Sequence, residues 1–153
     1  MEELPMITVN VLERCHKETE QTLAVEETAF LQQPITYFKK EIEQFLYVGA
    51  SEFEAVKMDA VVIEFDEMFK VHTALFGLSI QKKYSQALKG YLRDHLKGML
   101  GSSSAMFNGD EGLWEVNIAF EAMEGFTGEE TIEQAIEKLI AFVTKMLAEV
   151  VGK

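Results

Sequence analysis

Hydrophobic residues recur at helical spacing along much of the chain. From Ser51 onward they form a stripe that spans about 140° of a helical wheel, and His72 lies near its centre. The stripe consists of Met58, Val61, Val62, Phe65, Met68, Phe69, His72, Leu75 and Phe76. A second stripe follows, made of Ile80, Tyr84, Ala87, Leu88, Tyr91, Leu92, His95 and Met99. The spacing predicts two consecutive amphipathic helices, over 51–76 and 80–100.

The C-terminal segment has the clearest helical pattern. Its apolar residues lie along one narrow line of the helical wheel, and glutamates occupy other positions. The line consists of Ile132, Ile136, Leu139, Val143, Met146 and Val150. We expect a helix over 128–151 that packs along much of the domain.

Short local motifs indicate where several helices begin. Ser51–Glu54 and Thr127–Glu130 have the spacing of a capping box. Pro34 suits the first turn of a helix, where its missing N–H would have no partner, and Asn108 suits an N-cap.

One segment also has the period of a strand. Alternating apolar residues extend from Trp114 to Ala122, and a shorter alternation runs from Ile7 to Val11. Residues 109–124 are long for a strand and end before Gly125. We predict a helix there, with two short paired strands as the alternative.

These patterns predict an all-α fold with six helices in a single domain, residues 1–153. The helices are expected near 6–31, 35–48, 51–76, 80–100, 109–124 and 128–151, with short connections.

Composition and charge narrow the functional classes. Hydrophobic residues make up 48% of the chain, and its 11 Phe and 8 Met suit either a soft core or an adaptable apolar pocket. The net charge of −12 argues against a nucleic-acid partner, because phosphate binding needs clustered Lys and Arg. Only residues 79–100 are basic, with a net charge of +4.

The sequence also indicates where the protein resides. Its single cysteine, Cys15, excludes an internal disulfide, and no signal-peptide pattern opens the chain. The longest apolar run is far shorter than the roughly 20 residues that span a bilayer. We therefore expect a cytoplasmic protein with no transmembrane segment.

Glu13 and His16 have the Glu-x-x-His spacing of di-metal helical bundles. Such sites need a second pair of this kind, which the sequence lacks. No Gly-rich phosphate loop, zinc-ligand spacing or nucleophile elbow is present. A carboxylate–histidine metal enzyme is therefore the weakest functional hypothesis.

His72 and His95 are the most informative candidates for a site. Each could be a core histidine satisfied by a neighbour, a haem ligand, or a donor to the polar head of a ligand in an apolar pocket. If the two predicted helices pack together, both imidazoles face one cavity, with Tyr84 and Tyr91 supplying hydroxyls. The predicted ligand-binding residues are Phe65, Met68, Phe69, His72, Phe76, Tyr84, Leu88, Tyr91, His95 and Met99.

The predicted helix order, with His72 on a long third helix and His95 on the next, resembles the globin fold. In particular it resembles the non-haem globin sensor domains of spore-forming bacteria. These occur at the N-terminus of a sporulation sensor histidine kinase and as free-standing proteins that inhibit sporulation. The resemblance rests on layout and covers nearly the whole chain.

This resemblance implies a globin-like domain that is not an enzyme and binds no haem. It implies a fatty acid, or a similar small apolar ligand, held in an internal tunnel, with chloride or another anion nearby. It also implies a homodimer formed through the C-terminal helices, and a role in sporulation kinase signalling by sequestering the signal.

The charge of the chain supports a different hypothesis. An acidic protein–protein interaction module could inhibit a basic partner, which its carboxylates would attract over a distance.

Overall fold

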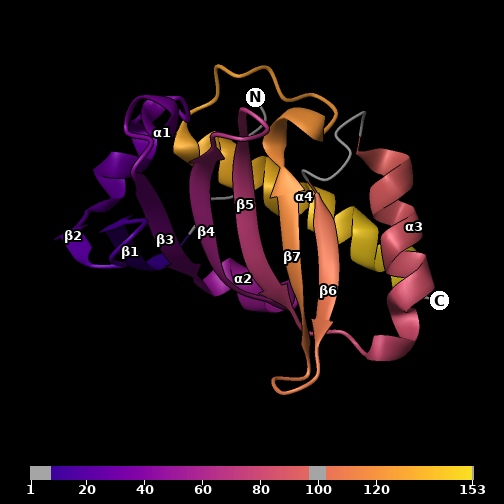
Figure 1. Ribbon diagram of the computed structural model, residues 1–153. Coiled ribbons are helices and arrows are strands. Elements are labelled where there is room, and N and C mark those ends of the chain that lie inside the picture. The colour runs from indigo at the N-terminus through magenta and orange to yellow at the C-terminus, as the bar shows by residue number, and fades with distance from the viewer. Residues whose placement is uncertain (1–7, 97–102, 153) are drawn as a thin grey trace.

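An antiparallel sheet backed by a long helix forms the body of the molecule. The computed structural model describes residues 8–96 and 103–152. Seven strands lie in the order β2-β1-β3-β4-β5-β7-β6, and each is antiparallel to its neighbours. Figure 1 shows α4 behind the sheet and α3 beside the β6 edge.

The strands are β1 (Val9–His16), β2 (Thr22–Val25), β3 (Gln44–Ala50), β4 (Met58–Asp66), β5 (Val71–Leu78), β6 (Ser104–Asn108) and β7 (Leu113–Ala119). The α-helices are α1 (Tyr37–Lys40), α2 (Ser51–Ala55), α3 (Ser85–His95) and α4 (Ile132–Val150). Short 3-10 helices are η1 (Thr28–Gln32), η2 (Lys82–Tyr84) and η3 (Phe120–Ala122).

The predicted all-α, six-helix globin-like fold is wrong. The described part of 6–31 holds β1, β2 and η1, while 35–48 holds α1 and most of β3. Residues 51–76 form α2 and the β4–β5 hairpin, and 109–124 hold β7 and η3. The alternative of a strand in 109–124 is therefore confirmed, but β7 pairs with β5 and β6 and not with the N-terminal strand β1. Helices are confirmed within only two of the predicted ranges, by α3 (Ser85–His95) in 80–100 and by α4 (Ile132–Val150) in 128–151; residues 97–100 lie outside the described residues.

Apolar side chains on both faces of β4 explain the largest error. Val61 and Ile63 are fully buried on the covered side of the sheet, while Val62 between them lies half-buried on the other side. A strand with apolar residues on both faces loses its period of two. The same positions then also fit a helical stripe.

The turns of the β4–β5 and β6–β7 hairpins each begin at a polar side chain that accepts backbone N–H groups. Asp66 Oδ1 accepts the backbone N–H groups of Met68 and Phe69, at 2.8 and 3.1 Å, so an aspartate begins the β4–β5 turn without glycine or proline. Asn108 Oδ1 similarly accepts the N–H groups of Asp110 and Glu111. Asn108 therefore begins a hairpin turn, where we expected a helix cap.

The cap of α4 lies four residues beyond its predicted position. Thr131 and Gln134 form the capping box, each side chain accepting the other's backbone N–H. Pro34 pairs with Thr131 in an isolated bridge and precedes α1. Ser51 is the first residue of α2, whose N-cap makes no side-chain hydrogen bond.

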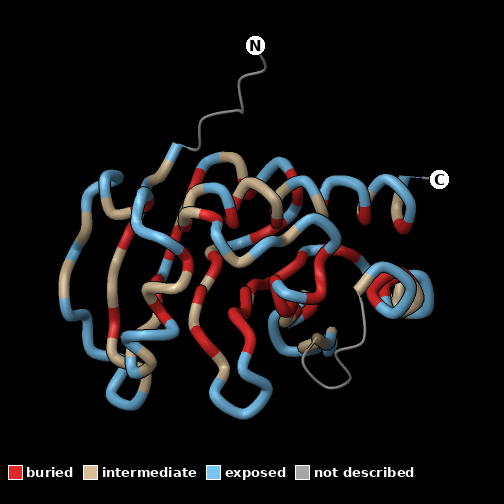
Figure 2. The backbone as a smooth tube through the Cα atoms, turned by 90° about the horizontal axis from the view of Figure 1, so that it is seen from above, coloured by how far each residue is buried: buried red, intermediate tan, exposed pale blue. Residues whose placement is uncertain are grey.

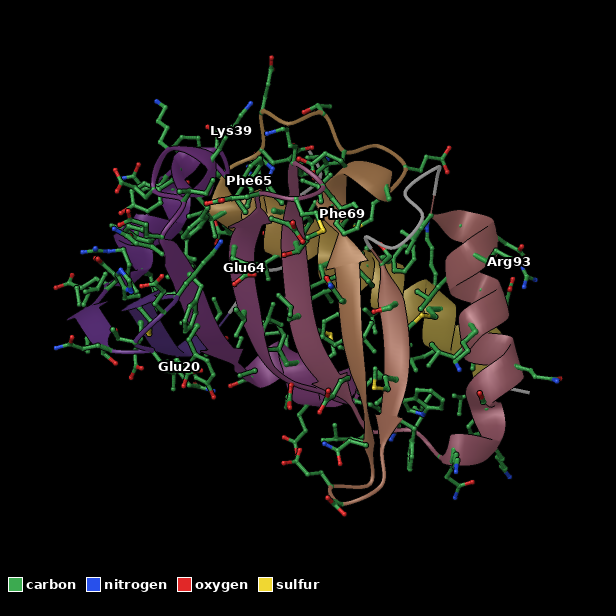
Figure 3. The ribbon with its side chains drawn as sticks, in the orientation of Figure 1. Glu20, Lys39, Glu64, Phe65, Phe69 and Arg93 are labelled. Carbon is green, nitrogen blue, oxygen red and sulfur yellow. The ribbon has the colours of Figure 1, made fainter. Side chains whose placement is uncertain are left out.

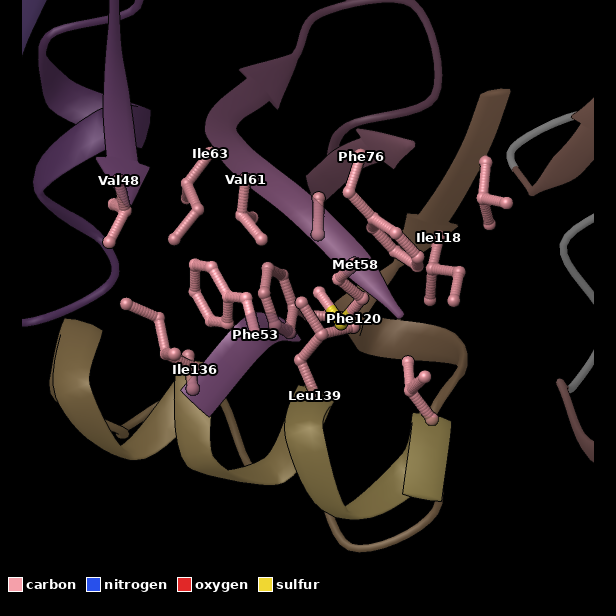
Figure 4. Packing of buried hydrophobic residues seen from close by; sticks show 14 of the residues in the cluster. Val48, Phe53, Met58, Val61, Ile63, Phe76, Ile118, Phe120, Ile136 and Leu139 are labelled. Carbon is pink, nitrogen blue, oxygen red and sulfur yellow. The ribbon is translucent and has the colours of Figure 1, made fainter. Parts of the chain in front are cut away.

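The core fills the space between the sheet and α4. Figure 4 shows Phe53 and Phe120 between the strands and Ile136 and Leu139 of α4, and Figure 2 shows buried positions concentrated in the middle of the molecule. The apolar line of α4 is buried against its own sheet. That line therefore gives no support to a homodimer through the C-terminal helices, which stays a prediction.

No helix in 8–96 or 103–152 has the length and hydrophobicity to cross a membrane.

Candidate functional site

The most extensive candidate surface is the sheet face opposite α4, which we call the open face. Within the part of the chain that the structure describes, no helix covers it (Figure 1). One end is buried where Leu96 packs on Val71, Ala119 and Ala122. A row of directly paired residues crosses the remainder: Glu13, Tyr47, Val62, Leu75, Asn117 and Ser104.

A groove of about 500 Å³ runs along the middle of the open face. Its apolar lining includes Val62, Leu75 and Leu113, which are half-buried. Tyr47 and Met106 also line it and are 38% and 68% exposed. The volume lies in the range of protein binding sites, so the groove has room for side chains or a small molecule.

The open face is acidic. Asp59, Glu111 and Glu115 line the groove, and none of its lining residues among those described is Lys or Arg. Glu13 and Glu64 project from the same face of β1 and β4, where they pair across strands with Tyr47 and Thr73. The surface therefore combines apolar side chains with carboxylates and favours positively charged groups.

Glu64 is a half-buried carboxylate of the open face, and Figure 3 shows it on β4. Burial raises the pKa of its carboxyl; Lys17 opposes this effect and Asp66 adds to it. A cation that bound nearby would favour the ionised carboxylate. Binding of a basic group should therefore weaken as the pH falls toward this raised pKa.

Gly77 allows the groove to hold a carboxylate against the backbone. Asp59 Oδ1 accepts the Gly77 N–H at 2.7 Å. A Cβ at Gly77 would lie 2.4 Å from Asp59 Oδ2, so any larger residue would displace this carboxylate. The glycine thus fixes one negative charge inside the groove.

His72 occupies the core rather than a cavity. Its backbone N–H donates to Glu121 Oε1 at 2.8 Å and its Nδ1 donates to Glu121 Oε2 at 2.6 Å. Its ring packs edge-on against Phe65, with centroids 4.9 Å apart, and is only 3% exposed. Nε2 has no partner among the described residues. His72 is therefore a core histidine satisfied by a neighbour at Nδ1.

The structure does not gather the other predicted ligand-binding residues in one cavity. Phe76 and Leu88 belong to the core, whereas Met68 and Phe69 lie exposed in the β4–β5 turn. Figure 3 shows Phe69 there. Tyr84 is partly buried on η2. Met99 lies outside the described residues.

Two of the predicted residues do share a pocket. His95 stacks on Tyr91, and both line a hollow between α3 and α4. His72 is not part of this lining. The two histidines therefore do not face a common cavity.

The structure separates the metal ligands proposed from the sequence. Glu13 pairs with Tyr47 and His16 with Gln44, so the two side chains lie on opposite faces of β1. Within 8–96 and 103–152, no three His, Cys, Asp or Glu side chains lie close enough to hold a metal ion.

The chain was also compared with known proteins. No family model, curated protein or solved structure matches it. The sporulation-sensor resemblance stays a prediction, and the function must be inferred from the geometry of the chain itself.

Sequence reasoning missed the open face because it depends on strand pairing. Tyr47, Leu75 and Asn117 are distant in sequence and adjacent only after the sheet forms. The available signal was the strict alternation from Trp114 to Ala122, whose intervening residues include Glu115 and Asn117.

Proposed function

We propose that this protein is a non-enzymatic interaction module whose open face binds a segment of a partner protein that carries both apolar and basic side chains. One observation carries the proposal: an apolar groove flanked by carboxylates lies on a sheet face that no described helix covers. This is the acidic-module hypothesis, now with a defined surface.

The shape of the groove favours a polypeptide segment. Its apolar side chains are spread over β3, β4, β5, β7 and β6 and do not enclose one deep cavity. A segment lying along it could cover Tyr47 and Met106, which are the most exposed apolar residues of the lining. Burying such surface contributes about 25 cal/mol per Å².

The charge of the face determines which partner is favoured. Asp59, Glu111 and Glu115 line the groove, and the whole chain carries a net charge of −12. Lys or Arg beside the apolar residues of the partner would meet these carboxylates and accelerate association. An acidic segment of the same hydrophobicity would be repelled.

Selection of peptides from a random display library tests this proposal. The variant Leu75→Lys places a positive charge in the middle of the groove, and Ala148→Lys makes the same charge change on an exposed position of α4. We expect selected peptides to combine Lys or Arg with apolar residues. Their affinity should fall about tenfold or more in Leu75→Lys and little in Ala148→Lys.

Two results would overturn the proposal. The first is a selection that yields acidic or uncharged peptides; the second is equal affinity for both variants. Circular dichroism of Leu75→Lys, compared with the unmodified protein, would separate lost binding from lost folding.

A further inference from the structure

A second hollow, which we call the α3–α4 pocket, lies on another side of the molecule. It encloses about 450 Å³ and shares no lining residue with the open-face groove. The lining comes from α3, the loop before α4, and α4 itself: Tyr91, His95, Met123, Glu124, Gly125, Lys138, Ala141, Phe142 and Lys145.

Three rings and one thioether give this pocket its apolar walls. The rings of Tyr91 and His95 stack with centroids 3.8 Å apart and an interplanar angle of 14°. Phe142 meets Tyr91 edge-on at 5.7 Å, and Met123 is buried beside them. Such walls suit a flat aromatic ring or a short aliphatic chain.

The pocket also concentrates positive charge in an acidic protein. Lys138 and Lys145 are the only Lys or Arg residues between 103 and 152, and both line it. Lys138 already donates to the Gly125 carbonyl and the Glu130 carboxylate. Lys145 forms no ion pair with any residue that the structure describes. Among the lining residues that the structure describes, Glu124 is the one carboxylate.

Two further polar groups belong to the same lining. The His95 Nδ1 lies 3.0 Å from the Tyr91 carbonyl oxygen, which can only accept, so Nδ1 donates and Nε2 is left for another partner. Burial, together with the Glu149 carboxylate, raises the pKa of the Tyr91 phenol and keeps it protonated at neutral pH.

We propose that the α3–α4 pocket binds a small monocarboxylate with an aromatic or short aliphatic body. The apolar walls, His95 among them, would hold the body, and the Lys145 ammonium would bind the carboxylate. The chain carries a net charge of −12, and the two lysines of the lining give this pocket a local attraction for a carboxylate. The site requires neither the open face nor a protein partner.

Amide chemical-shift mapping tests this site with two probes of matched shape, benzoate and benzamide. We expect benzoate at up to about 10 mM to shift the amides of Tyr91, Phe142 and Lys145, with benzamide roughly tenfold weaker. Lys145→Gln should weaken benzoate binding by about tenfold, whereas Lys82→Gln, on exposed η2, should not. Both positions are exposed, so the fold should survive.

The proposal is overturned if benzamide binds as well as benzoate, if Lys145→Gln has no effect, or if benzoate shifts no amide of this pocket. Leu75→Lys separates this site from the open face. It should leave benzoate binding unchanged even where it abolishes peptide binding.

Discussion

The two faces of the sheet are built from alternate residues of the same strands, yet they differ in chemistry. On β5, Ala74 and Phe76 are buried against the core, while Leu75 between them lines the open groove. The covered face is continuous with α4 and almost entirely apolar. The open face keeps apolar residues but separates them with carboxylates such as Asp59 and Glu115.

This difference shows that hydrophobicity alone does not distinguish core from binding surface in this protein. Both faces contain valine, leucine and aromatic residues. The covered face excludes charge because an unpaired buried ion costs several kcal/mol. The open face includes charge, which keeps its apolar groove in water and selects what can bind there.

The largest predicted effect compares adjacent residues of β4. Ile63→Ala should lower the free energy of unfolding by about 2–5 kcal/mol, because it leaves a cavity in a fully buried site. Val62→Ala, on the open face, should lower the free energy of unfolding by about 1 kcal/mol or less, since the Val62 side chain is only half-buried. Denaturant unfolding of both variants measures the difference, and equal losses would mean that the open face is also core.

His72 is a polar residue on the otherwise apolar covered face, and removing its partner Glu121 should produce the next largest effect. Glu121→Ala removes the acceptor for both N–H groups of His72 and should destabilise the fold by about 2 kcal/mol. Glu124→Ala, an exposed neighbour, serves as the matched control and should change stability by less than about 0.5 kcal/mol. Thermal unfolding that fails to separate the two variants would show that Glu121 does not stabilise His72.

An effect of similar size depends on pH and concerns the loop that leads into α4. Burial raises the pKa of Glu130, but Lys138 and the N–H groups of Thr127 and Gly128 outweigh it and lower the pKa to about 2. Since the folded pKa lies below the ordinary value of 4.5, this carboxylate stabilises the fold above that value. The contribution is lost as the pH falls from about 4.5 toward about 2.

We expect Glu130→Gln to be about 2 kcal/mol less stable than the unmodified protein at pH 7, a figure reduced because Lys138 is partly exposed. The difference should shrink as the pH approaches about 2. Urea unfolding at several pH values measures this, and a difference that is constant with pH would contradict the assignment. Glu129→Gln is the matched control, because Glu129 is exposed.

The sequence correctly predicted α3 and α4, the helices in which one face is buried and the other is exposed. The apolar line of α4, from Ile132 to Val150, is continuous and meets a single surface, so its period is clear. α3 similarly contrasts buried Leu88 and Leu92 with exposed Lys89 and Arg93. In both cases local pattern and tertiary packing agree.

The prediction from sequence was wrong for the β4–β5 hairpin, whose strands have apolar residues on both faces and whose turn lacks glycine. β4 and β5 have apolar residues on both faces, and the turn between them begins at Asp66. A helical stripe from Met58 to Phe76 fits such a hairpin by coincidence, and the globin-like layout followed from it. Of the predicted site residues that the structure describes, only Tyr91 and His95 share a pocket, because they lie one turn apart on a true helix.

Photo-cross-linking in the organism that makes the protein tests the central proposal most directly. A photoreactive residue at Met106 would lie beside the open groove, and one at Ala148 would lie on exposed α4. We predict that Met106 captures protein segments with Lys or Arg next to apolar residues, and that Ala148 does not. Capture of the same segments from both positions, or none from Met106, would contradict the role of the open face.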